Sequence, residues 1–256
     1  MLVAVISLVW TPYDPTLAHP DVSLASPSAE HLLGTDRFGR DTASRIMAGA
    51  QITVFVGLVA VGIAAVVGVP LGILAGMRRG TWADALVMRG ADLLLAFPAL
   101  LLAIIAGAVW GPSTLTAMIA IGIAGIPSFA RVARSGTLQV ITQDYISSAR
   151  ISAVPGWKVA WRHILPNLAG LLIVQASVYF ALAILAEAGL SYLGLGTAPP
   201  AASWGRMLQD SQSLLGTAPL QAFWPGLAIA ATVLGFNLLG DALRDLLDPR
   251  LKGSAR

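Results

Sequence analysis

The sequence contains no cysteine, and only 11% of its 256 residues are charged. The lack of cysteine excludes a disulfide scaffold and cysteine-ligated zinc or iron–sulfur sites. Soluble domains carry roughly 25% charged residues, whereas this chain is 56% hydrophobic with a mean hydropathy of +0.76. Such hydrophobicity also excludes an intrinsically disordered chain. The composition therefore indicates a membrane protein.

Four long runs lack any charged residue: 46–77, 93–130, 164–186 and 211–240. A helix needs roughly 20 apolar residues to cross a hydrocarbon core about 30 Å thick, so each run can cross at least once. The runs lack the period-two alternation of lipid-facing strands, which argues against a transmembrane barrel. The sequence predicts an all-α, polytopic membrane protein.

The position of glycine and proline divides these runs into spans. Met1–Trp10 is apolar but too short to cross, and it is interpreted as the outer part of a truncated first helix. Gly111–Pro112 splits the longest run into a hairpin of two spans. Counting the truncated helix, six transmembrane helices are expected. The five full spans are 51–77, 87–110, 113–130, 168–186 and 223–240.

Two parts follow from this division. Residues 1–50 are expected to hold the partial first helix, an outer polar segment and an interfacial helix over Gly39–Gly49. Residues 51–256 form the core transmembrane domain, with an inner loop at 134–167 and an outer loop at 190–222. Five glycines in the first full span predict close helix approach: Gly57, Gly62, Gly68, Gly72 and Gly76.

The distribution of lysine and arginine predicts the orientation. Placing segments 78–90, 131–166 and 241–256 on one side puts twelve of the sixteen basic residues there. That side is expected to be cytoplasmic, with both termini inside. The pI near 9.7 then reflects a basic face beside anionic lipid, and no nucleic-acid partner is expected.

The inner segment Gln143–Asn167 is unusually long and half apolar for a connection between helices. Ser147–Ser152 and Trp157–His163 are predicted as short helices, separated by Val154–Pro155–Gly156. Lys158 and Arg162 share one helical face, while tryptophans give other faces an apolar character. The pattern fits either docking into a groove of a partner or an interfacial helix anchored on anionic lipid.

This segment resembles the EAA loop of the permease subunits of binding-protein-dependent ABC importers, most closely at its ending, residues 162–167 (RHILPN). Further ordered blocks resemble the "C" permeases of dipeptide, oligopeptide and nickel importers. They are 31–41 (HLLGTDRFGRD), Phe97–Pro98, 194–196 (GLG), 203–205 (SWG), 236–241 (FNLLGD) and 247–250 (LDPR). The resemblance covers nearly the whole chain from about Thr11 onward.

The sequence departs from the family pattern in two places. Ser147-Ser148-Ala149 stands where the loop usually has Glu-Ala-Ala, and Ala153 stands where it usually has glycine. Because a left-handed conformation is costly for alanine, the turn is expected at Pro155–Gly156 instead.

The resemblance implies the type I permease fold of ABC importers and a mechanism. This subunit and a second permease subunit would form a heterodimer around a path for di- or oligopeptides in a bacterial cytoplasmic membrane. Two cytoplasmic ATPase subunits or domains would bind the EAA loops of the two permease subunits, and an extracytoplasmic solute-binding protein would deliver the cargo. The implied coupling residues are Ser147, Ser148, Ala149, Arg150, Ala153, Val154, Pro155, Gly156, Trp157 and Lys158. Nickel or another small solute is the alternative cargo.

Two acidic residues invite a functional interpretation. Glu187 is the one acid between Ile164 and Gly205, so it could line the path or a subunit interface, or lie at a water-accessible helix end. Asp92 could bind substrate, but a local pair with Arg89 is favoured.

Signals for catalysis are missing from the sequence. The three histidines share no metal spacing, and neither an HExxH motif nor a Walker phosphate loop is present. The chain is therefore expected to be no enzyme and to bind no cofactor; ATP and magnesium would bind its partners. A secondary transporter, the rival outside this class, would usually show internal repeats and more buried ionisable residues.

Overall fold

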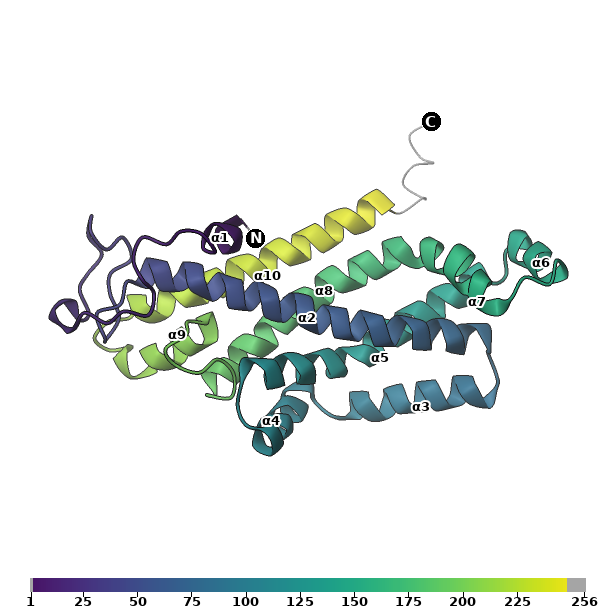
Figure 1. Cartoon of the computed structure of the whole chain (residues 1–256), viewed down its shortest axis with the longest axis horizontal. Helices are drawn as coiled ribbons and strands as arrows, with labels where there is room; N and C mark the ends of the chain where they lie inside the picture. The colour runs from purple at the N-terminus through teal and green to yellow at the C-terminus, as the bar shows by residue number, and fades with distance from the viewer. Residues whose placement is uncertain (1, 248–256) are drawn as a thin grey trace. The chain divides into compact units, whose positions relative to one another are not determined.

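The computed structural model describes residues 2–247, so Asp248-Pro249-Arg250 and the basic residues Lys252 and Arg256 lie outside them. The described residues form helices and no β-strand beyond an isolated bridge between Thr35 and Asp41 (Figure 1). The expected all-α architecture is confirmed. In order, the elements are α1 (Leu2–Ile6), η1 (Pro20–Val22), α2 (Thr42–Met77), α3 (Trp82–Ala96), α4 (Ala99–Trp110), α5 (Thr114–Val140), α6 (Asp144–Ile151), α7 (Gly156–Val159), η2 (Ala160–Ile164), α8 (Leu165–Tyr192), α9 (Trp204–Ser211), η3 (Gln212–Leu214) and α10 (Leu220–Leu247).

Four helical stretches in the described part of the chain are long and apolar enough to cross a membrane. They are α2, α5, the continuous run Gly156–Tyr192, and Leu220–Leu246 of α10. The pair α3 and α4 adds a fifth if it is counted as one bent span. Four of the five full spans expected are therefore confirmed, and the fifth, 87–110, falls on this pair, whose helices are bent by 82° relative to each other. The α1 helix covers five residues, so the truncated first span stays a prediction.

The first full span begins earlier than expected. The predicted separate helix over Gly39–Gly49 is instead the start of α2, which is continuous from Thr42. Asp41 accepts a hydrogen bond from the Ser44 backbone N–H at 2.8 Å and so caps the helix. The helix continues through Gly49, and the Trp204 ring lies so close that a Cβ added at Gly49 would be 2.8 Å from it.

The third span is interrupted at Phe97–Pro98. Phe97 adopts an extended conformation (φ −93°, ψ 124°) and ends α3. Proline disfavours the helical conformation in the residue before it and supplies no backbone N–H, which explains the break. The expected uninterrupted span over 87–110 is therefore two helices.

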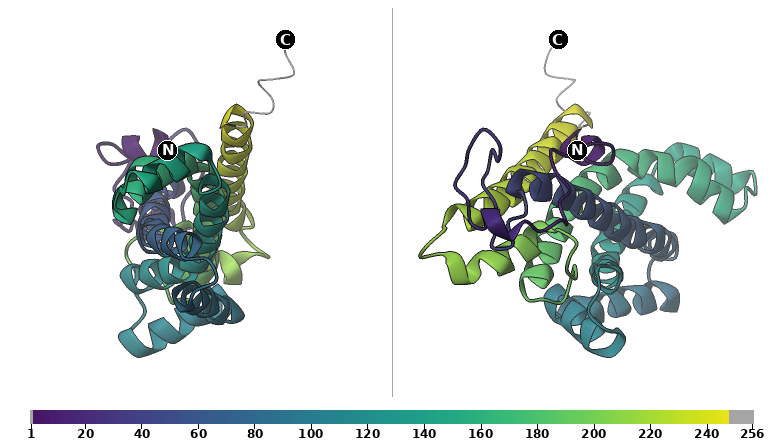
Figure 2. Two further views of the ribbon diagram at one scale, coloured as in Figure 1. Left: turned by 90° about the vertical axis from the view of Figure 1, so that its right-hand side faces the viewer. Right: turned by 60° about the vertical axis from the view of Figure 1, so that its left-hand side comes forward.

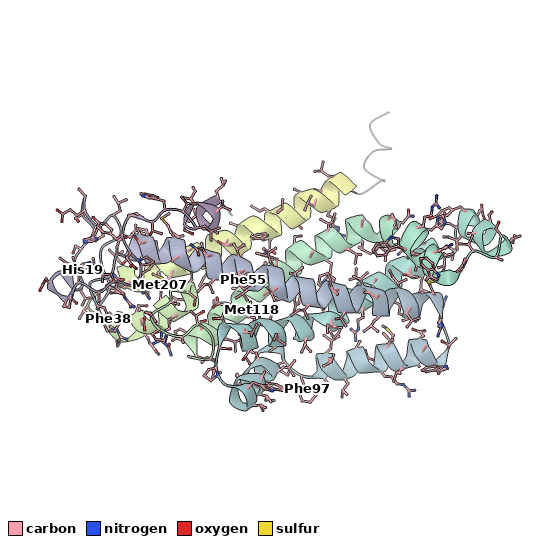
Figure 3. All side chains as sticks on the ribbon, viewed as in Figure 1. His19, Phe38, Phe55, Phe97, Met118 and Met207 are labelled. Carbon is pink, nitrogen blue, oxygen red and sulfur yellow. The ribbon has the colours of Figure 1, made fainter. Side chains whose placement is uncertain are left out.

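The chain forms two compact units. The first comprises residues 1–59, 100–121 and 181–234, and the second comprises 60–99, 122–180 and the described part of 235–256. In the first unit, polar side chains tie the outer segment to helix ends. Gln221 donates to the Thr35 carbonyl (2.8 Å), and its amide oxygen accepts from the Thr42 hydroxyl (3.2 Å). His19, Phe38 and Met207 lie together at one end of this unit (Figure 3).

The second unit is built on close contact between α2 and α5. A Cβ added at Gly68 would lie 2.6 Å from the Ile126 carbonyl oxygen, and one at Gly76 would lie 2.6 Å from Thr137 Cβ. Gly72, between them, abuts the Ala130 carbonyl. Glycines four residues apart on α2 therefore let the two backbones meet. The helix approach expected from the sequence is confirmed for these three.

Candidate functional site

The segment between α5 and α8 folds into two short helices joined by a turn. α6 precedes the turn, and α7 with the π-helical turn η2 follows it and leads directly into α8 (Figure 2). The first predicted short helix is present as α6, which begins at Asp144 and ends at Ile151. The second is not a separate short helix, because the helix that begins at Gly156 continues without a break to Tyr192.

One side of this segment is fixed in the core of the second unit. Ile146 from α6, Val159 from α7 and Ile164 from η2 are buried in one cluster with Phe129, Ala133 and Leu168. Ala149 and Val154 pack against the same cluster. The short helices are therefore attached to the long helices by apolar contacts from both sides of the turn.

The other side of the segment exposes large apolar groups. Trp157 is 69% exposed and Trp161 is 72% exposed. The Lys158 ammonium lies 5.5 Å from the centre of the Trp157 ring, which allows a cation–π contact. Exposed aromatic side chains on helices that are packed firmly against the core are typical of a surface that another molecule covers.

The turn between the helices is a Schellman motif. Ala153 has a left-handed conformation (φ +53°), and the Val154 N–H donates to the Ala149 carbonyl at 3.1 Å. The expectation that Pro155–Gly156 would replace the left-handed residue is wrong. The capping bond and the packing of Ala149 and Val154 on the core hold Ala153 in a conformation that is costly for alanine.

A cavity of about 860 Å³ opens beside this segment. Val69, Ile73 and Met77 of α2 form one wall, and Trp157 and Trp161 form the other. Its lining is mostly apolar. The exposed indole rings of Trp157 and Trp161 therefore form part of a cavity wall in the second unit.

The coupling residues implied by the resemblance occupy distinct positions in this segment. Ser147 and Ser148 are exposed on α6, where the Ser148 hydroxyl donates to the Asp144 carbonyl at 3.1 Å. Pro155, Gly156 and Lys158 are exposed at the start of α7. Arg150 lies on α6. The structure brings all of these residues together around a single turn.

The expected local pair of Asp92 has a different partner. Asp92 accepts a hydrogen bond from Arg131 of α5 at 2.5 Å, so the predicted pair with Arg89 is wrong. Arg131 is 39 residues away in sequence, so the spacing of charges along one helix could not indicate it.

Glu187 is buried within the first unit, so a water-accessible helix end is also wrong. The Ser191 hydroxyl donates to its carboxylate at 2.6 Å and accepts from the Thr197 N–H at 3.0 Å. The carboxylate thereby helps to fix the chain that follows α8. A role in the path or at an interface stays a prediction.

A cluster of opposite charges in the first unit was not foreseen from the sequence. It comprises Asp36, Arg37, Arg40, Arg45, Arg206 and Asp210, joined by ion pairs of 2.7–3.9 Å. One feature of the sequence could have indicated this cluster. All four basic residues outside the predicted cytoplasmic segments are arginines, and three of them lie within residues 37–45.

The spans define a multi-pass helical membrane protein, and its 143–167 segment is anchored to the core on one side and exposes Trp157 and Trp161 on the other. Residues 68–253 match the family described as the inner membrane component of binding-protein-dependent transport systems, and the chain belongs to this family. It is therefore a transport permease, and proteins of this kind work with further subunits.

Comparisons with individual proteins agree with this assignment. The chain is 42% identical to the dipeptide transport system permease protein DppC of Alkalihalophilus pseudofirmus, over 98% of this chain and 83% of the relative. It is 45% identical to the glutathione transport system permease protein GsiD of Pectobacterium atrosepticum, over 88% and 75%. A structure of the inward-facing MetNI methionine ABC transporter matches its fold with a TM-score of 0.66 at 17% identity, covering 79% of this chain and 96% of that one.

Proposed function

We propose that this chain is one of two permease subunits that together form the path of an ATP-driven importer of di- or oligopeptides. Similarity to permeases named for dipeptide and glutathione transport supports peptides as cargo. No group of three or more metal-ligating side chains occurs in residues 2–247, so nothing here favours the nickel alternative. A solute-binding protein outside the membrane delivers the peptide, and ATP is hydrolysed by partner subunits.

Coupling to those ATPases uses the segment 143–167, and the observation that carries this proposal is the two-sided character of that segment. Ile146, Val159 and Ile164 are buried in the core, whereas Trp157 and Trp161 remain exposed. A force applied to the exposed face is transmitted to α5 and α8 through the buried side chains, because close-packed side chains yield little.

The same exposed tryptophans could instead anchor the segment on lipid. Docking is favoured because the segment is a short, capped turn between two helices fixed to the core, with exposed serines and a lysine around it. Such a preorganised surface loses little conformational entropy when a protein binds it. A long amphipathic helix, by contrast, is the usual interfacial anchor.

The substitution Trp157→Glu in the reconstituted importer tests this proposal. It should reduce the amount of ATPase that co-purifies with the permease and lower the ATP hydrolysis that peptide-loaded solute-binding protein stimulates, while membrane insertion stays intact. A loss of roughly tenfold or more in ATPase affinity corresponds to about 1.4 kcal/mol, as for a central interface aromatic.

Trp82→Glu is the matched control, because Trp82 is also highly exposed, lies in the second unit and is predicted on the same side of the membrane. Stimulated hydrolysis should persist in this variant. If Trp157→Glu leaves stimulated hydrolysis unchanged, or if it only prevents membrane insertion, the coupling proposal is wrong and lipid anchoring replaces it.

A further inference from the structure

Asp92 of α3 and Arg131 of α5 form an ion pair that the coupling of the 143–167 segment does not use. Arg131 donates a hydrogen bond to the Asp92 carboxylate at 2.5 Å, and both residues belong to the second unit. The Asp92 side chain is 63% exposed and that of Arg131 is 51% exposed. The medium that surrounds this open pair therefore decides its role.

The packing of α5 against α2 places the pair beside a stretch of α2 that carries no charge. A Cβ added at Gly72 would abut the carbonyl of Ala130, the residue before Arg131. Gly72 lies within the charge-free run 46–77, which ends just before Arg78. At 1.5 Å of helix per residue, the pair therefore lies about 9 Å inside the end of that run.

The packing of α5 against α8 gives the same level. Gly125 and Gly136 lie on either side of Arg131 along α5. A Cβ added at Gly125 would meet the Tyr179 ring, and one added at Gly136 would lie 3.1 Å from the Leu168 side chain. Both contacts fall within the charge-free run 164–186. An exposed acid–base pair thus lies level with the apolar parts of two membrane-spanning helices.

Water is the medium that this face of α5 fits best. Charged side chains within membrane-spanning segments face the interior of a bundle or a water-filled cavity rather than lipid. Ser135 and Gln139, which follow Arg131 at four-residue spacing, are also exposed and polar. The fully buried core of a protein interface is depleted of charged residues. A water-filled path therefore suits this polar stripe better than lipid or a dry subunit contact.

The chemistry of the pair matches the two ends of a peptide. A peptide with free ends carries an ammonium and a carboxylate group, and both need polar partners while the peptide crosses the membrane. The Asp92 carboxylate can accept from an ammonium group, and the Arg131 guanidinium can donate two hydrogen bonds to a carboxylate. Because an exposed ion pair contributes little stability, a peptide can separate the two side chains at small cost. Weak contacts of this kind also allow the cargo to leave again.

We propose that Asp92 and Arg131 form a contact site in the translocation path, where Arg131 binds the C-terminal carboxylate of the passing peptide and Asp92 binds its ammonium group. This inference rests on the proposed function, which supplies both the path and the peptide. In the empty importer the two side chains neutralise each other, so the path presents no unpaired charge at this level.

The test measures peptide uptake per ATP hydrolysed by the complete importer in proteoliposomes with saturating solute-binding protein. The cargo is whichever of alanyl-alanine and glutathione that binding protein binds. Asp92→Asn, Arg131→Gln and the double variant should each lower the ratio by roughly tenfold, as for the loss of a hydrogen bond to a charged group. Arg131→Lys, which keeps the positive charge, should retain most of the uptake.

The double variant separates peptide binding from a structural ion pair. It leaves neither charge unpaired, so a purely structural role predicts normal uptake per ATP, and that result would overturn the proposal. A ratio that falls only together with the melting temperature, or with loss of the second permease subunit from the purified complex, also overturns it. Arg79→Gln is the control, because it removes an exposed arginine of the same unit from the turn before α3. An equal loss in this control rejects the site.

Access of water to the stripe is tested separately with Ser135→Cys, because the chain has no cysteine of its own. A water-soluble maleimide should label this position in the complete importer, either without nucleotide or with ATP and vanadate. A position that stays unlabelled in both states faces no water, which overturns the proposal.

The contact site and the proposed function fail in different ways. Unchanged ratios in the Asp92 and Arg131 variants, with normal uptake by the unaltered importer, reject the contact site alone. Absence of both stimulated hydrolysis and uptake in the unaltered importer rejects the proposed function, and the contact site with it.

Discussion

Arg134 of α5 binds both carboxylate oxygens of Asp84 of α3, at 2.7 and 2.9 Å. Asp84 also accepts a hydrogen bond from the Gly80 N–H at 3.1 Å, and so fixes the turn that leads into α3. This arrangement differs from the second ion pair between the same helices. The Asp84–Arg134 side chains are 9% and 28% exposed, whereas those of Asp92 and Arg131 are 63% and 51% exposed.

The difference in exposure predicts different energies. Asp84→Asn should lower the stability of the permease by about 1–3 kcal/mol, because it removes the charge from a bidentate, largely buried contact. Asp92→Asn should change it by less than about 0.5 kcal/mol, as expected for a solvent-screened pair. Thermal unfolding in one detergent compares the two variants. Equal melting temperatures would contradict this ranking.

The contact between α2 and α5 predicts that added bulk is harmful only at particular glycines. Gly72→Ala should cost about 1–3 kcal/mol, because its methyl group would collide with the Ala130 backbone carbonyl and the helices would have to separate. Gly62→Ala, on the same helix with nothing within 4 Å of the added carbon, should be neutral or stabilising by up to about 1 kcal/mol. Melting temperatures of the purified variants test this, and a reversed order would refute the assigned packing.

The left-handed Ala153 predicts a stabilising substitution. Ala153→Gly should relieve about 1 kcal/mol of strain, because glycine adopts this conformation without a steric penalty. Hydrogen exchange at the Val154 amide, which closes the turn, should slow in this variant. Ala149→Gly, inside α6, should accelerate it instead. Faster exchange in Ala153→Gly would show that the turn is not strained as described.

The predicted orientation can be tested directly, because the chain has no cysteine of its own. Ser148→Cys on α6 and Ser213→Cys on η3 are a matched pair of exposed serines. An impermeant maleimide added to intact cells should label position 213 and leave position 148 unmodified until the cells are opened and denatured in detergent, which also removes any bound ATPase. The reverse pattern would invert the assigned topology.

The elements that depend on local sequence were predictable. Charge-free runs marked the four spans that are single helices, and the short helix α6 and the start of a second helix at Gly156 followed from the sequence of the 143–167 segment. The sequence predicted a separate helix over Gly39–Gly49, whereas α2 is continuous from its cap at Asp41 to Met77. Phe97–Pro98 was recognised as a block that resembles the family, but the sequence analysis did not predict that a helix ends there.

The sequence by itself determined that the chain spans a membrane, where it crosses and to which family it is similar, because hydrophobicity and short motifs are properties of contiguous residues. Only the tertiary structure decided the partners of the charges. Asp92 pairs with Arg131 rather than Arg89, Glu187 is buried beside Ser191, and Asp210 gathers four arginines. It also decided that Ala153 bends left-handed, since the packing of its neighbours on the core outweighs the local preference of one residue. Long-range pairing and packing depend on how distant segments meet, which no local pattern encodes.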